Sequence, residues 1–204
     1  MADDIFATDD NGTEEAKEWE KFYVKLYLNS LKKRTMLINQ DIDDDLIEKH
    51  TLQLINLDKI NHDPITIYVN SNGGNLYEGI NLCDVISSLK SPVNTICLSH
   101  AFSAAFVIFM AGKERMAYKN SILLMHPIIR TNIADENVPS LLSEAEFLDK
   151  ITKRLAKYFA EKTSRSEKHW EQKVLKSAHD VYFFPEEALK LGIITEIITG
   201  ERND

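Results

Sequence analysis

Residues 98–112 of this chain read LSHAFSAAFVIFMAG and place one small hydroxyl, Ser103, in front of a long apolar run. The stretch Val93 to Leu98 predicts a strand before it. The apolar run meets no strong breaker before Gly112 and predicts a buried helix. Ser103 is therefore expected at a strand-to-helix turn, where backbone N–H groups and the positive end of the helix dipole face whatever reacts there. Such a hydroxyl is a candidate nucleophile if the chain also supplies a base, an orienting acid and an oxyanion hole.

Strand and helix patterns alternate along the rest of the chain. Strands are predicted at residues 35–39, 65–69, 93–98 and 193–198, with one or two more over residues 115–125, broken around Lys119-Asn120. Helices are predicted at residues 43–60, 76–89, 140–163, 166–177 and 185–191. This alternation predicts an α/β fold with mainly parallel strands. Residues 16–31 fit either a helix or a strand, and residues 130–139 predict a loop. The acidic residues 1–20 predict a mobile N-terminal segment, followed by a single domain over residues 21–204.

Composition excludes several classes of partner and cofactor. The net charge is −8 in 204 residues, which argues against nucleic acid or an anionic membrane as the main partner. The apolar run 101–111 is too short to span a bilayer, and no signal peptide is recognised. Cys83 and Cys97 predict buried free thiols in a reducing, cytoplasmic setting. No GxGxxG, Walker, HExxH or Cys/His cluster occurs, so we expect neither a cofactor nor a metal.

Several residues are candidates for the groups that Ser103 needs. His126 ends an apolar strand and is followed by Pro127, so its side chain can face a site from a rigid backbone. His100 is too near Ser103 in sequence to act as its base and is expected to line the pocket instead. The Gly73-Gly74 pair fits either a turn that needs positive φ or a pair of oxyanion donors, and the pair alone does not separate the two.

Four motifs resemble the ClpP family, the caseinolytic serine peptidases of Clp complexes. Residues 68–74, YVNSNGG, are similar to its Y-I-N-S-P-G-G turn, and residues 101–106, AFSAAF, stand where it has A-A-S-M-G-A-F. Residues 125–127, MHP, stand where it has M-I-H-Q-P, and residues 180–188, DVYFFPEEA, where it has D-x-F-x-S-A-x-E-A. The resemblance covers residues 31–198 and identifies the chain as a divergent member. It implies a ClpP/crotonase-like fold with stacked ββα units and a protruding long helix.

The resemblance also implies a role for each matching residue. Ser103 corresponds to the nucleophile, His126 to its general base, and Asp180 to the acid that orients the imidazole. Gly74 and Ala104 match the positions whose backbone N–H groups form the oxyanion hole. On its own, Asp180 would be interpreted as a helix or turn cap. The implied activity is endopeptidase cleavage of unfolded polypeptides inside a ring-shaped chamber, through an acyl-enzyme.

The implied partners are further copies of the chain, as two stacked heptameric rings, and a Clp-type AAA+ ATPase. Ring contacts are expected along residues 140–163. In the family the ATPase docks in pockets lined by aromatic residues; Thr66 and Ser88 stand at two matching positions, and Tyr68 is kept. These departures predict altered docking. The segment after His126 and the residue before Asp180, His179, also differ from those the family uses in contacts between rings.

Two other functions remain open from the sequence. One is a crotonase-like enzyme that acts on acyl-CoA, in which two backbone N–H groups hold an oxyanion and carboxylates transfer protons. The other is a non-catalytic, assembly or maturation subunit on the same fold. The presence of Ser103, His126 and Asp180 argues against both.

Overall fold

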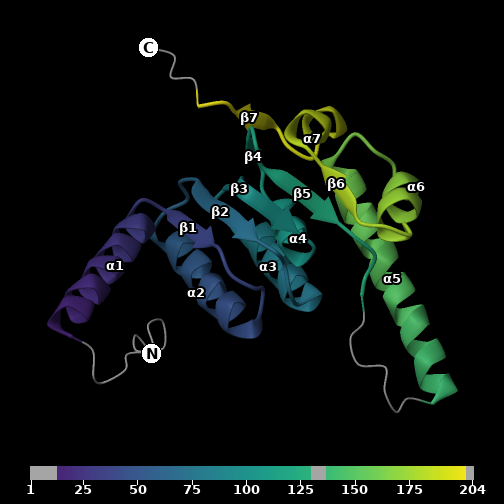
Figure 1. Ribbon diagram of the computed structural model, residues 1–204, viewed down its shortest axis with the longest axis horizontal. Coiled ribbons are helices and arrows are strands. Elements are labelled where there is room, and N and C mark those ends of the chain that lie inside the picture. Colours follow the sequence, from purple (N-terminus) through teal and green to yellow (C-terminus); the bar gives the residue numbers. More distant parts are fainter. Residues whose placement is uncertain (1–12, 130–136, 201–204) are drawn as a thin grey trace.

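A seven-stranded sheet organises the part of the chain described by the computed structural model, residues 13–129 and 137–200 (Figure 1). Neighbouring strands run in the order β1-β2-β3-β4-β7, and β5 and β6 extend the sheet beside β3. The strands are β1 (Thr35–Ile38), β2 (Ile65–Ser71), β3 (Val93–Phe102), β4 (Arg115–Tyr118), β5 (Ile122–Met125), β6 (Val181–Phe183) and β7 (Glu196–Ile198). The ladders from β1 to β7 are parallel, which confirms the prediction of mainly parallel pairing. Only β6 is antiparallel, against β5, among the strands described.

The long strand β3 determines where Ser103 lies. Its first half pairs with β4, from Thr95 opposite Arg115, and its second half pairs with β5, from His100 opposite Ile122. The prediction that this strand ends at Leu98 was therefore wrong. Pairing with β5 extends it to Phe102, because cross-strand partners can outweigh local propensity. Ser103 follows the last residue of the strand directly.

Most helices agree with the sequence patterns. They are α1 (Glu14–Lys32), α2 (Asp44–Ile60), α3 (Leu76–Ser88), α4 (Ala104–Phe109), α5 (Val138–Lys162), α6 (Glu167–His169), the π-helix η1 (Trp170–Leu175) and α7 (Pro185–Leu191). The predicted helix over residues 166–177 is divided between α6 and η1. Of the predicted loop 130–139, residues 130–136 lie outside the described residues, and α5 begins at Val138 after its cap Asn137.

Helix α4 lies at the centre of the core. All six of its residues are buried, as expected of a helix that is apolar on every side. The ring of Phe106 packs against Phe159 of α5, Trp170 of η1 and Phe183 of β6, with centroids 5.4, 6.2 and 6.0 Å apart. Burial of one such side chain stabilises a fold by about 1.5–3 kcal/mol. This packing fixes the start of α4, and with it the turn that carries Ser103.

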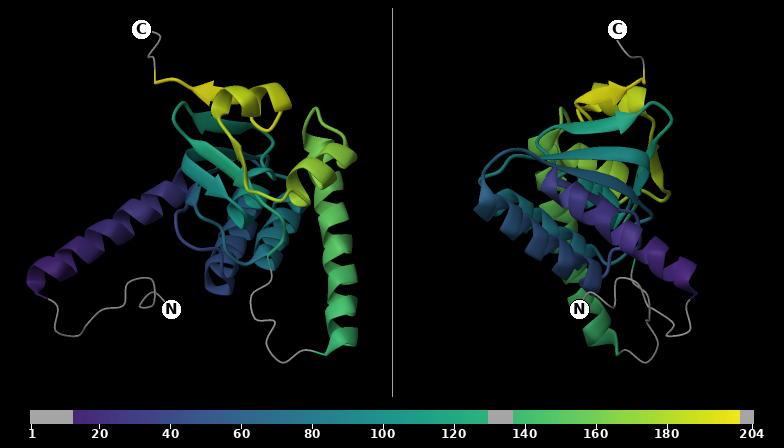
Figure 2. Two further views of the ribbon diagram at one scale, coloured as in Figure 1. Left: turned by 45° about the vertical axis from the view of Figure 1, so that its right-hand side comes forward. Right: turned by 90° about the vertical axis from the view of Figure 1, so that its left-hand side faces the viewer.

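Two helices extend beyond the body of the molecule. The N-terminal part of α5 projects past the sheet and the other helices, and α1 extends on the opposite side (Figures 1 and 2). The long protruding helix predicted from the family resemblance is thus α5. Residues 16–31, which fitted a helix or a strand, lie in α1. The proposed boundary at residue 20 stays a prediction, because residues 1–12 lie outside the described part.

Candidate active site

Ser103 occupies a strained turn between β3 and α4. Its backbone has φ 54° and ψ −121°, a region that residues other than glycine rarely adopt. The N–H of Ser103 donates to the Leu124 carbonyl at 3.0 Å, which attaches the turn to β5. The hydroxyl does not cap α4 and is partly exposed. A rigid, sharp turn that presents a free hydroxyl is the arrangement expected of a nucleophile.

The Gly73-Gly74 loop packs directly on this turn. Gly73 has φ 102°, and a Cβ there would lie 2.6 Å from the Phe102 carbonyl oxygen and 2.8 Å from the Ser103 Cβ. Gly74 has φ 147°, and a Cβ there would lie 2.4 Å from the carbonyl oxygen of Ile42. Both glycines are therefore required by backbone angle and by close approach.

Two N–H groups near Ser103 remain unengaged. Hydrogen bonds fix the loop on either side of Gly74: Ile42 N–H donates to the Gly73 carbonyl at 2.8 Å, and Asn75 N–H donates to the Ile42 carbonyl at 2.7 Å. Within the described chain, no hydrogen bond uses the N–H of Gly74 or that of Ala104, the first residue of α4. These are the two groups predicted to form an oxyanion hole.

His126 follows β5 and is partly buried beside Ser103. Its Nδ1 lies 2.6 Å from the carbonyl oxygen of the next residue, Pro127. A carbonyl oxygen only accepts, so this contact places the ring proton on Nδ1 and leaves Nε2 as the basic nitrogen. That tautomer is the one a general base for a serine hydroxyl needs.

Asp180 lies just before β6, and the β5–β6 register brings it toward His126. The pairs are Leu123 with Phe183 and Met125 with Val181, so extending the ladder by one residue sets His126 opposite Asp180. Side chains at such positions are neighbours across a sheet. Asp180 is nevertheless exposed, and no hydrogen bond between described residues joins it to His126, or His126 to Ser103. The backbone thus brings the three residues into one region, and their catalytic roles stay a prediction.

A cleft of ≈ 640 Å³ opens over Ser103, within the size range of ligand pockets. It brings together Ser103, His126 and Gly74; Asp180 and Ala104 do not line it. Its other walls come from the start of α3, the segment after β5 and the side of α5: Asn75, Leu76, Tyr77, Met125, Ile128, Ile129, Glu144 and Leu148. These wall residues were not identified from the sequence. The aromatic Tyr77 three residues after Gly74 was the one local signal that could have found a wall.

Neither His100 nor His50 lines the Ser103 cleft. The expectation that His100 lines the Ser103 pocket was wrong: His100 lines a separate hollow of ≈ 180 Å³ with polar residues such as Asn70 and Asn72. The reason is that β3 continues through Phe102, whose ring contacts that of His100 at 5.0 Å on the same face of the strand. His50 is buried, with ring nitrogens 2.8 Å from the Leu46 carbonyl and 3.1 Å from that of Leu37, and is structural.

Several further observations bear on the predicted chemistry. Cys83 and Cys97 are free and buried, and burial raises the pKa of each thiol to about 12, so neither is a thiolate nucleophile. In residues 13–129 and 137–200, no three His, Cys, Asp or Glu side chains are grouped as a metal site would require. No helix in these ranges is long and apolar enough to cross a membrane.

Comparisons with known proteins by family profile, by sequence and by structure all match Clp proteases. The sequence profile of the Clp protease family matches residues 16–201. An ATP-dependent Clp protease proteolytic subunit from Deinococcus radiodurans is 31% identical over 183 residues, which are 88% of this chain and 87% of the relative. One from Carsonella ruddii is 38% identical over 106 residues, 51% of this chain and 55% of the relative. The solved structure of a ClpP1 mutant from Listeria monocytogenes has a TM-score of 0.76 and 27% identity, and covers 87% of this chain and 98% of that one.

Proposed function

This chain belongs to the Clp protease family of serine peptidases, as a proteolytic subunit, and from this premise we propose that Ser103, His126 and Asp180 form its catalytic triad. The observation that carries the proposal is the strained Ser103 turn, which shares one cleft with His126 and Gly74. A backbone held at φ 54° costs stability, and such strain concentrates at functional sites.

The proposed reaction is acyl transfer to Ser103. Its Oγ attacks the substrate carbonyl carbon while the hydroxyl proton passes to Nε2 of His126. The oxygen of the tetrahedral intermediate accepts hydrogen bonds from the N–H groups of Gly74 and Ala104. His126 then protonates the leaving amine, and the acyl-enzyme is hydrolysed by a water that the same nitrogen activates.

Asp180 enters this scheme through a rotation of the His126 ring. In the structure Nδ1–H donates to the Pro127 carbonyl, which holds the correct tautomer without stabilising a positive charge strongly. A carboxylate stabilises the imidazolium far better than a neutral carbonyl does. In the active arrangement that we propose, the His126 side chain has rotated. Its Nδ1–H then donates to Asp180, its neighbour in the extended β5–β6 register, and no longer to Pro127.

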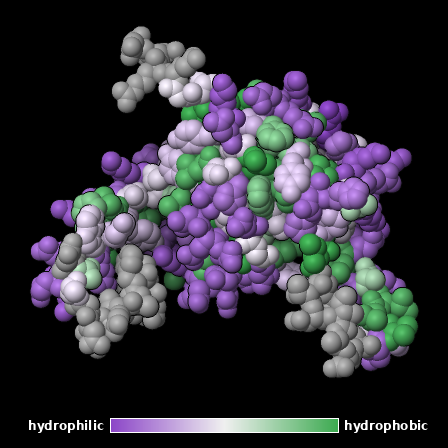
Figure 3. All heavy atoms as spheres, viewed as in Figure 1, coloured by the Kyte–Doolittle hydropathy of each residue, from purple (hydrophilic) through white to green (hydrophobic). Residues whose placement is uncertain are grey.

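We further propose that the chain acts as a ring-shaped assembly on unfolded polypeptides in the cytoplasm, as two stacked heptameric rings. The projecting end of α5 carries apolar side chains, visible at the lower right of Figure 3, including Val138 at 68% and Leu142 at 63% exposure. An apolar surface of this kind on an extended helix supports contacts with another copy. The relatives are named ATP-dependent, which supports a Clp-type AAA+ ATPase as partner. Thr66 and the exposed Ser88 support altered docking.

Hydrolysis of a fluorogenic peptide by the assembled protein tests the proposed nucleophile and base. We expect Ser103→Ala and His126→Gln each to lower kcat/KM by at least about a thousandfold. The matched control is Ser99→Ala, which removes an exposed hydroxyl from the same strand and should leave activity unchanged. Full activity in Ser103→Ala would refute the proposal. An inactive parent chain, tested together with its ATPase, would refute it as well.

A further inference from the structure

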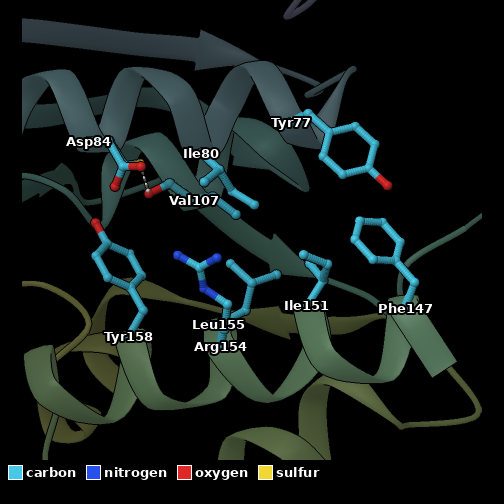
Figure 4. A pocket seen from close by; sticks show the side chains of 10 residues that line it. Tyr77, Ile80, Asp84, Val107, Phe147, Ile151, Arg154, Leu155 and Tyr158 are labelled. Atoms are coloured by element: carbon cyan, nitrogen blue, oxygen red, sulfur yellow. Dashed lines mark hydrogen bonds between the residues drawn. The ribbon is translucent and has the colours of Figure 1, made fainter.

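A second cavity, of ≈ 340 Å³, lies between α3 and α5 (Figure 4). It shares Tyr77 with the Ser103 cleft, and its other lining residues are distinct from those of the cleft. The face of α5 that turns to the cleft carries Glu144 and Leu148, whereas Phe147 and Ile151 turn to the cavity. The cavity is thus a separate site that shares a wall with the cleft.

The middle of the cavity is apolar and one end is aromatic. Ile80 of α3 faces Ile151 and Leu155 of α5 across it (Figure 4). The rings of Tyr77 and Phe147 stack at this end, with centroids 6.3 Å apart and planes at 28°. Apolar walls with aromatic rings at one end fit an aliphatic or aromatic side chain.

The other end of the cavity carries opposite charges on opposite walls. Asp84 extends from α3 and Arg154 from α5, and both line the cavity (Figure 4). Neither takes part in an ion pair or hydrogen bond with another residue of the described ranges, as the ion pairs there involve other side chains. Two unpaired charges of opposite sign beside an apolar cavity are complementary to a ligand that carries both an ammonium and a carboxylate.

A buried hydroxyl lies at the same end. The Tyr158 hydroxyl has no hydrogen-bond partner in the described part of the chain. The nearby Cys83 thiol donates instead to the Val107 carbonyl, at 3.3 Å. The hydroxyl oxygen has less than 1 Å² of accessible surface, so the Tyr158 ring lines the cavity while the hydroxyl lies behind its wall, next to Cys83.

We propose that this cavity binds a zwitterionic apolar ligand: a free apolar amino acid, or a short peptide of such residues with both termini free. The ammonium contacts Asp84, and the carboxylate contacts Arg154. The apolar side chain lies between Ile80 and Ile151. Because Tyr77 also lines the Ser103 cleft, the bound ligand contacts a wall of that cleft.

Calorimetric titration of the full-length Ser103→Ala protein with leucine, phenylalanine and the dipeptide Leu-Phe tests the proposal. We expect saturable binding that Asp84→Asn and Arg154→Gln each weaken by at least about tenfold, the loss that follows removal of one charged hydrogen-bonding partner. N-acetyl-leucine and leucinamide each lack one charge and should also bind more weakly than leucine. The control Lys157→Gln removes an exposed charge from α5 outside the cavity and should leave binding unchanged. Equal affinities for leucine, phenylalanine and Leu-Phe would show that a single amino acid is enough for binding. Binding of Leu-Phe alone would identify short peptides as the ligand.

Alkylation of Cys83, followed by peptide mass spectrometry, gives a second measurement that needs no variant. We expect the ligand to slow labelling of Cys83, which lines the cavity, and not of Cys97, which is buried elsewhere and has a pKa raised equally. The proposal is overturned if none of the three ligands binds, if both charge variants bind as the parent does, or if Cys83 gains no protection. These outcomes are independent of the proposed catalysis, because the titrated protein lacks Ser103.

Discussion

At the scale of single residues, the site combines one strained backbone with two glycines that make room for it. Ser103 is held at φ 54° by its bond to Leu124 and by the buried helix that follows it. Gly73 and Gly74 lie beside it. A Cβ at Gly73 would overlap the Phe102 carbonyl, and a Cβ at Gly74 would overlap the Ile42 carbonyl. These residues, and the imidazole of His126, could be selected as candidates from the sequence, because a hydroxyl, an imidazole and a glycine pair each suggest a particular chemical role.

What the sequence could not predict is the state of the His126 ring. The bond from Nδ1 to Pro127 depends on a side-chain rotation, and the pairing of His126 with Asp180 depends on a ladder between strands more than fifty residues apart in the chain. Neither leaves a local sequence pattern. The position of His100 could not be predicted for the same reason. It lies outside the Ser103 cleft because β3 continues past it to pair with β5.

The first residue-scale prediction concerns Asp180. We expect Asp180→Asn to lower kcat by about 10²–10⁴-fold, because the amide does not stabilise the imidazolium and disfavours the required tautomer. Steady-state peptide hydrolysis measures this. Glu186→Gln, at an exposed acid of the adjacent α7, is the matched control and should retain activity. If Asp180→Asn is as active as the control, the Pro127 carbonyl alone orients the ring and Asp180 has no catalytic role.

The second residue-scale prediction concerns Gly73. We expect Gly73→Ala to lower the free energy of unfolding by about 2 kcal/mol or more, since the new Cβ meets both positive φ and two atoms closer than 3 Å. Urea denaturation measures the loss. The control is Gly200→Ala, where φ is 74° but nothing lies within 4 Å, so the cost is limited to about 1–2 kcal/mol of backbone strain. Equal losses in the two variants would contradict the close approach of the loop to Ser103.

At the scale of elements, the sequence patterns predicted most helices and strands, and tertiary contacts account for the differences. The helix over residues 43–60 was predicted, and α2 buries one face that includes Leu46, Ile47 and Leu54. The extension of β3 and the short strand β6 were missed, because both exist through pairing with β5. The walls of the Ser103 cleft were missed for a similar reason, since α3 and α5 meet only in the folded chain.

The element-scale prediction concerns α2, which buries His50. Burial lowers the pKa of His50, against the effect of its two backbone hydrogen bonds. The unfolded chain therefore binds a proton more readily, and stability is expected to fall as the pH drops below about 6.5, the unperturbed pKa of histidine. Chemical denaturation between pH 7.5 and pH 5.5, about one unit on either side of that pKa, measures this slope. The slope should flatten in His50→Gln and persist in His179→Gln, at an exposed site; an unchanged slope in His50→Gln would contradict the assignment.

At the scale of the whole molecule, the sheet and its central helix α4 form the body, and α1 and α5 extend from it (Figure 2). The body carries the cleft, and the projecting helices carry exposed apolar side chains, including Trp19 and Phe22 on α1 and Leu142 on α5. A single copy leaves these side chains in water. The proposed ring assembly would cover them with other copies of the chain.

The projecting end of α5 is expected to contribute to contacts between copies of the chain. We expect Leu142→Glu to lower the mass of the assembly, because a charge would then face another copy in place of an apolar contact. Analytical ultracentrifugation measures the mass. The Leu142 side chain is 63% exposed in the single chain, so the thermal stability of the folded chain should be nearly unchanged by the substitution. Lys150→Glu, an exposed change on the same helix, is the control. An undiminished mass in Leu142→Glu would exclude this end of α5 from the interface.

That Ser103 is the nucleophile is tested most directly by finding which residue a fluorophosphonate probe modifies covalently. The assembled protein is treated with the probe, digested, and analysed by tandem mass spectrometry. We predict one phosphonyl adduct per chain, on Ser103, and none on Ser99 or Ser121. We also predict no adduct in His126→Gln under the same conditions, because the hydroxyl then lacks its base. An adduct on another serine, or an unmodified Ser103 in a protein that hydrolyses peptides, would show that Ser103 is not the nucleophile.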